Sequence, residues 1–123
     1  MRFMMMVKHA EQQGLPPKEL MDAIAILAEE DVKAGTMIGS GGLAPVAQST
    51  HVRISKGELT VTDGPFTEAK EVVGGLAILE ANSKEEAIKL AKNFLQVAGD
   101  GECELRQLFG AGQDTCADVA ASA

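Results

Sequence analysis

Apolar residues gather in short runs that are separated by glycine, proline and charged residues. Runs of this length, bounded by turn-forming residues, are typical of β-strands. The predicted strands span residues 2–8, 36–43, 49–54, 58–62, 72–80 and 102–109. The run 72–80 is the longest, so we expect it in the middle of a sheet. The tripeptide 55–57 is short enough to join its two flanking runs as a hairpin.

Two further segments repeat apolar residues at helical spacing. The first opens at the proline pair 16–17 and stops at Gly35, because proline suits a first helical turn and glycine suits the position beyond a C-terminus. The second opens at Ser83, whose hydroxyl forms a capping box with Glu86 three residues later. The sequence therefore predicts two helices, each of which lies between two strands.

The order of the elements indicates the fold class. It is βα, then a strand with an inserted hairpin, then βαβ; without the hairpin this is the ferredoxin-like βαββαβ pattern of an α+β fold. Residues 1–110 are expected to form a single domain, and the small, polar residues 111–123 a disordered tail. Two helices cover only one face of such a sheet, and an uncovered apolar face would form a large exposed patch. We therefore expect a homodimer that buries the second face.

Charge and composition narrow the function classes. Eighteen acidic residues against eleven basic ones give a net charge of −7, without the clustered Lys and Arg that nucleic-acid binding needs. The apolar run 3–7 is too short for a signal peptide or a membrane span. Cys103 and Cys116 make no disulfide framework, and free thiols indicate a cytoplasmic location. Two distant histidines and two unmatched cysteines lack the spacing of a metal site, and we expect no cofactor.

The segment 61–71 carries the densest set of candidate functional groups. It reads Val-Thr-Asp-Gly-Pro-Phe-Thr-Glu-Ala-Lys-Glu and connects two predicted strands. Loops held between strands are common places for binding or catalytic groups. The segment therefore predicts where a site lies, and leaves the chemistry of that site open.

Residues 63–66, Asp-Gly-Pro-Phe, resemble the DGPF signature of the YCII-related proteins. The glycine-rich stretch 39–45, the Val-Arg pair 52–53 and the tripeptide 104–106 also resemble motifs of that family. The resemblance covers roughly residues 1 to 110. It implies a ferredoxin-like domain that dimerises in a dimeric α/β-barrel arrangement. It implies little about the reaction, because most members have no assigned activity and fold does not fix function.

Asp63 and His9 are the candidate catalytic residues. As a general base, Asp63 would need a pocket and a proton-transfer partner within hydrogen-bond reach. The resemblance implies a histidine–aspartate pair, which here would be His9 with Asp63. In the alternative, the Asp63 carboxylate fixes its own turn through backbone amides, and His9 is a surface residue. Family members often have an acidic residue where Ser40 stands, which weakens a shared acid–base mechanism.

Arg53, Lys70 and Glu71 are the candidate substrate-binding residues. An arginine on a strand near a turn carboxylate can hold an anionic substrate through a bidentate contact. Lys70 would add a second cation and Glu71 a second carboxylate. The alternative is an ion-pair network that fixes the turn and the edge of the dimer.

Three functions remain open at this point. The first is a cofactor-independent enzyme that uses Asp63, with His9 or Arg53, for acid–base chemistry on a small anionic or aromatic molecule. The second is a ligand-binding or regulatory accessory protein with a pocket between sheet and helices, in which the motif around Asp63 is structural. The third is that the motif simply builds the dimer. The surroundings of Asp63 distinguish these readings.

Overall fold

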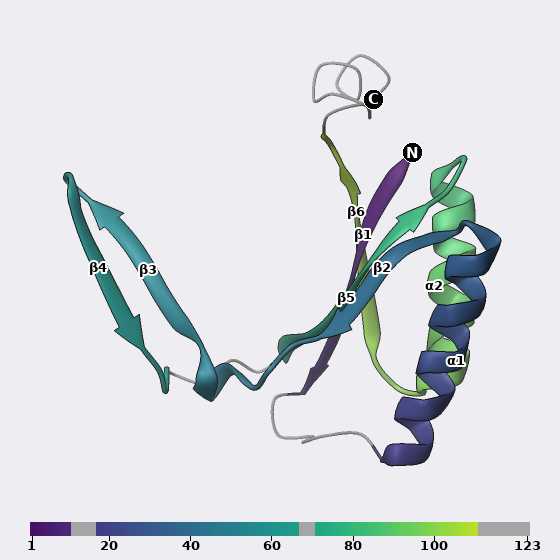
Figure 1. The fold of residues 1–123 in the computed structure, drawn as a ribbon, viewed down its shortest axis with the longest axis horizontal. Coiled ribbons are helices and arrows are strands. Elements are labelled where there is room, and N and C mark those ends of the chain that lie inside the picture. The colour runs from purple at the N-terminus through teal and green to yellow at the C-terminus, as the bar shows by residue number, and fades with distance from the viewer. Residues whose placement is uncertain (11–16, 67–70, 111–123) are drawn as a thin grey trace.

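The computed structural model describes residues 1–10, 17–66 and 71–110. Four strands form one antiparallel sheet in the order β2-β5-β1-β6. They are β1 (Arg2–Ala10), β2 (Met37–Gly42), β5 (Glu71–Glu80) and β6 (Glu102–Leu108). The helices α1 (Lys18–Ala34) and α2 (Lys84–Ala98) both cover the same face of this sheet (Figure 1). The mixed α/β fold with two helices is therefore as predicted.

A separate two-stranded hairpin is inserted between β2 and β5. A short 3₁₀ turn, η2 (Val46–Gln48), leads into it, and its strands are β3 (Thr50–Ser55) and β4 (Glu58–Asp63). Lys56 and Gly57 form its turn with positive φ angles of 51° and 84°, which suit the right-handed twist of the flanking strands. The hairpin extends away from the sheet on the side opposite the helices (Figure 1). The predicted hairpin is thus present, and its two strands pair only with each other.

Helix α1 ends, and helix α2 begins, as the sequence indicated. Gly35 adopts a φ of +80° after α1 and donates its N–H to the Val32 carbonyl at 3.1 Å, in a geometry that favours glycine. At the start of α2, the Ser83 hydroxyl accepts the Glu86 N–H at 3.2 Å. The Glu86 carboxylate in turn accepts the N–H of Asn82, the residue before the cap, at 2.7 Å, in an arrangement close to a capping box.

The core lies between the sheet and the helices and is small. Its buried residues are Phe3, Met5, Met37, Ala77, Leu79, Ala81, Ala87 and Ala91. Two of these belong to α2 and none to α1. Val32, in the last part of α1, is 50% exposed. The first helix is therefore attached to the sheet less closely than its sequence pattern suggested.

The opposite face of the sheet carries an apolar strip next to charged side chains of β6, because Glu104 and Arg106 pair with Met6 and Met4 and lie on the same side. Because neighbouring residues in a strand point to opposite faces, burial of Phe3 and Met5 turns Met4 and Met6 away from the helices. Ile78, between two buried residues of β5, points the same way. Met4, Met6 and Ile78 are all half-buried, and we call the surface they form the open face.

The structure does not test two sequence expectations, the domain boundary and the homodimer. The tail 111–123 is not described, so the boundary of the domain at residue 110 stays a prediction. The same holds for the homodimer, because the structure contains a single chain. Within the described ranges, neither helix is long and apolar enough to span a membrane.

Candidate functional site

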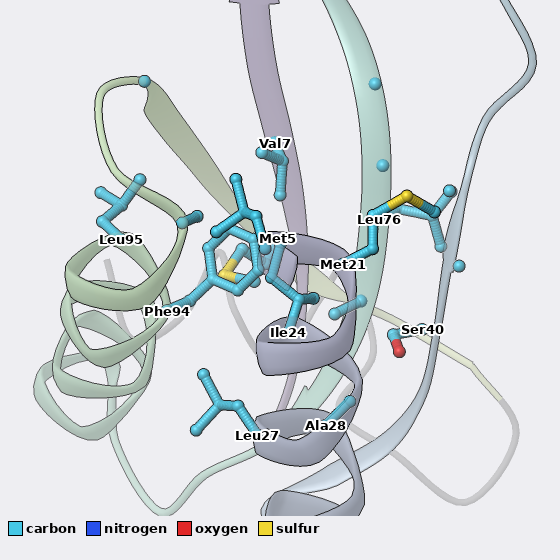
Figure 2. A pocket seen from close by; sticks show the side chains of 18 of the residues that line it. Met5, Val7, Met21, Ile24, Leu27, Ala28, Ser40, Leu76, Phe94 and Leu95 are labelled. Carbon is cyan, nitrogen blue, oxygen red and sulfur yellow. The ribbon is translucent and has the colours of Figure 1, made fainter. Parts of the chain in front are cut away.

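A cavity of about 660 Å³ lies between the helices and the sheet. Figure 2 shows apolar side chains reaching into it from three elements: Met5 and Val7 of β1, Ile24 and Leu27 of α1, and Phe94 of α2. A volume of this size and an apolar lining are typical of small-molecule sites. The cavity also explains why the first helix contributes no fully buried side chain.

Several polar groups lie on the wall of this apolar cavity. His9 reaches it from β1 and Ser40 from β2. Ser40 pairs with Ala77, a buried residue of the helix-covered side, so the serine lies on that side too. Asp31 lines the cavity from α1. A molecule in the cavity would therefore meet an apolar surface with a few polar groups at defined places.

The imidazole of His9 lies directly over Gly74 of β5. A β-bulge separates the pairs Val7–Gly75 and Lys8–Val73, so that Gly74 faces no partner residue. A Cβ atom at position 74 would overlap Nε2 and Cδ2 of His9. Glycine at this position therefore leaves the space that the histidine ring occupies.

Asp31 is a site residue that the sequence analysis missed. Burial raises the pKa of its carboxyl group, and repulsion from Glu30 adds to the effect, although a hydrogen bond with Thr36 opposes it. Its spacing from the apolar residues of the helix is the sequence signal that could have identified it. Ile24, Ala28 and Asp31 follow one another at helical intervals, which places a carboxylate on the apolar stripe of the helix.

Asp63 lies in a different place, at the base of the hairpin. Its Oδ1 accepts a hydrogen bond from the Thr50 hydroxyl at 2.7 Å, and the two residues are directly opposite each other in the β3–β4 ladder. The next residue, Gly64, donates its N–H to the Ser49 carbonyl at 2.8 Å. A Cβ atom at Gly64 would come within 2.9 Å of the Ala47 carbonyl oxygen, so the chain can pass here only as glycine.

Phe66 completes this arrangement. Its ring stacks on the His51 ring, with the centroids 3.6 Å apart and the planes at 4°. Stacking of this kind stabilises the folded state beyond the contribution of the apolar area that the rings bury. The Asp-Gly-Pro-Phe segment thus ties both ends of the hairpin together. The Asp63 carboxylate contacts a side-chain hydroxyl there, where the sequence analysis considered either a pocket or its own backbone amides.

The remaining predicted site residues are spread over the chain. Arg53 is exposed on β3, and its carbonyl accepts a hydrogen bond from the Thr60 hydroxyl at 3.5 Å. Lys70 lies outside the described residues, and Glu71 is described only as the first residue of β5. The described contacts thus place His9 at the cavity and Asp63 and Arg53 on the hairpin.

A group of charged side chains joins β1 and β6. Lys8 Nζ lies 2.7 Å from Glu104 Oε1, and Arg106 Nε lies 2.6 Å from Glu104 Oε2. These two hydrogen bonds lower the pKa of Glu104, and the bond from Lys8 has the larger effect. Cys103, which precedes Glu104 in β6, is a free thiol that packs against the core, and burial raises its pKa. These contacts fix the edge strand of the sheet.

Three comparisons relate the chain to known proteins. A solved 5-chloro-2-hydroxyhydroquinone dehydrochlorinase from Burkholderia phenoliruptrix AC1100, in complex with 2,5-dihydroxybenzoquinone, is 20% identical, with a TM-score of 0.45 over 93% of this chain and 100% of that one. An uncharacterised protein from Rhizobium meliloti (strain 1021) is 29% identical over 92 residues, 74% of each chain. The family model of the YCII-related domain matches residues 1–109.

Proposed function

We propose that this chain, which belongs to the YCII-related family, binds a small, largely apolar molecule in the cavity between its helices and its sheet. The observation that carries the proposal is the cavity itself, with a volume of about 660 Å³. That volume lies within the usual range of small-molecule sites. We propose an aromatic compound with one or two polar substituents, because the lining is mostly apolar with a few polar groups.

The polar groups of the wall would orient the bound molecule. The His9 imidazole can donate or accept a hydrogen bond. Ser40 adds a hydroxyl on the side of β2, and Asp31 adds a carboxyl group that burial makes easier to protonate. In an apolar cavity a few such groups contribute most of the specificity, because leaving any of them unpaired is costly.

A second candidate function is catalysis on the same bound molecule. The supporting observation is that a titratable imidazole, His9, lies on the cavity wall, where it could transfer a proton to or from a ligand. In this proposal Asp63 is structural, since its described hydrogen bond closes the hairpin. Any turnover found by screening aromatic compounds should then be lost in His9→Gln and kept in Asp63→Asn.

We also propose the finer features of the fold that the family resemblance implied. The strand order β2-β5-β1-β6 with both helices on one face supports a ferredoxin-like arrangement. Two copies would assemble through their open faces as a dimeric α/β barrel, because Met4, Met6 and Ile78 form an apolar strip on that face. A cytoplasmic location is proposed from the cysteine usage alone.

Titration with the fluorescent dye 1-anilinonaphthalene-8-sulfonate tests the binding proposal. Two residues of α1 provide a matched pair: Ile24 lines the cavity, whereas Ile26 is 58% exposed and lies off it. We expect Ile24→Trp to fill the cavity and weaken dye binding by about tenfold or more, equivalent to roughly 1.4 kcal/mol. Ile26→Trp should bind the dye as the unmodified protein does.

Two results would contradict the proposal. One is dye binding that Ile24→Trp and Ile26→Trp affect equally, which would place the dye on the surface. The other is the absence of saturable binding in the unmodified protein. Asp63→Asn serves as a further control, because a change confined to the hairpin should leave the affinity of the cavity unchanged.

A further inference from the structure

The hairpin presents a continuous apolar face to solvent. Val52 pairs with Val61, and Ile54 pairs with Leu59, so the four side chains lie on one side of the two strands. Their exposed fractions are 70%, 68%, 65% and 72%, in that order. These are the most exposed large apolar side chains in the described part of the chain. We call this surface the hairpin face.

The other side of the hairpin is polar. His51, Arg53, Thr60 and Thr62 alternate with the apolar residues and therefore point the opposite way. This separation of apolar and polar residues is the pattern of a strand pair with one side packed against another surface. A two-stranded hairpin is also only marginally stable in water without such a surface.

The described residues of the same chain do not provide that surface. Strands β3 and β4 form a sheet of their own, and the hairpin extends away from the helices and the main sheet (Figure 1). Its described links to the rest of the chain lie at its base, where Gly64 bonds to Ser49 and Phe66 stacks on His51. The hairpin face therefore remains uncovered over its whole length.

We propose that the hairpin is a dimerisation arm whose apolar face packs on a second copy of this chain. The inference deepens the assembly proposed above and rests on it. The hairpin projects on the side of the sheet that carries the open face, so that one partner can cover both apolar surfaces (Figure 1). In a two-fold symmetric pair each copy offers the same surfaces to the other, which doubles every contact.

The area involved is adequate for a stable dimer. Covering four Val, Ile or Leu side chains on each copy, together with an equal area on the receiving surfaces, removes on the order of 1,000 Å² from water. Specific interfaces bury about 1,200–2,000 Å². The open faces of the two sheets supply the remainder, so the arm and the open face together reach the standard size.

The chain offers a matched pair of double variants for the test. Leu59→Lys with Val61→Lys places two charges on the hairpin face, and Thr60→Lys with Thr62→Lys places two charges on the polar side of the same strand. Molar mass is measured by light scattering at micromolar concentration. We expect a dimer for the unmodified protein and for the threonine variant. We expect a monomer that keeps the helical circular dichroism signal for the Leu59/Val61 variant.

The outcomes separate this inference from the assembly it rests on. A monomeric unmodified protein would overturn both. A dimeric Leu59/Val61 variant would overturn the hairpin arm and leave the open-face dimer standing. As a second variant, residues 50–63 are replaced by a short Gly-Ser linker, which should give a folded monomer. A folded dimer, or an unfolded chain, would contradict the inference, since the arm is required only for contact with the partner.

Discussion

At the scale of single residues, the family resemblance implied a pair of His9 and Asp63, and the structure places the two residues in different parts of the chain. His9 follows the buried residues of β1 at intervals of two, so strand alternation alone brings it to the side where the cavity lies. Asp63 is the last residue of β4, where its carboxylate meets the hydroxyl of Thr50. The difference arises because the hairpin carries Asp63 away from the main sheet.

The position of the His9 ring depends on a single glycine. We predict that Gly74→Ala displaces the imidazole, because the added methyl group occupies its place. The ring can rotate aside, so the loss of folding free energy should be about 1 kcal/mol, the low end of overpacking effects. The shift of the His9 ring resonances, measured by NMR, reports the displacement. Gly39→Ala is the control, since its Cβ would meet nothing within 4 Å; equal spectra in the two variants would refute the prediction.

Asp31 links the cavity to pH. Because its pKa is raised in the folded protein, the unfolded chain loses this proton first as the pH rises, and stability falls between the ordinary pKa and the raised one. We predict that Asp31→Asn removes this loss. The melting temperature of the variant should slightly exceed that of the unmodified protein at neutral pH and match it at about pH 3. Asp22→Asn, an exposed change on the same helix, is the control, and an identical pH profile for both variants would contradict the prediction.

At the scale of elements, the two helices differ in how firmly they are held. The cap residues of α2 and its buried Ala87 and Ala91 attach it to the sheet, whereas α1 has no buried residue and borders the cavity. Local stability follows the density of buried contacts. Both helices line the cavity, but α1 is the less firmly attached, so a bound ligand should mainly stabilise α1.

This difference leads to a prediction for hydrogen exchange. We expect the amides in the middle of α1 to exchange at least about tenfold faster than those in the middle of α2. Saturation with 1-anilinonaphthalene-8-sulfonate should slow exchange in α1 and leave α2 nearly unchanged. Equal protection of the two helices without dye, or slowing confined to the hairpin, would show that the cavity does not control the first helix.

At the scale of the whole molecule, the described residues leave two apolar strand surfaces uncovered, the open face and the hairpin face. The helices cover one side of the sheet only, and the hairpin covers neither its own apolar side nor the sheet (Figure 1). Both surfaces favour association because exposed patches of this kind lower their free energy by leaving water. The proposed association and the proposed ligand binding would therefore use opposite sides of the sheet.

The sequence by itself determined the elements and their ends. Run length and the bounding turn residues placed the strands, helical spacing placed the helices, and Gly35, Ser83 and the turn at 55–57 ended or joined them, because these signals act over a few residues. The family could also be read from local motifs, and the match to residues 1–109 confirms it.

Only the tertiary structure decided where the candidate residues lie relative to one another. The cavity forms between elements far apart in the chain, so no local pattern shows that His9, Ser40 and Asp31 line one space. Likewise, the direction of the hairpin took Asp63 and Arg53 away from that space, although both lie in the motifs that looked most functional. Elements follow from short-range interactions that the sequence displays directly, whereas a site depends on how those elements pack across the whole chain.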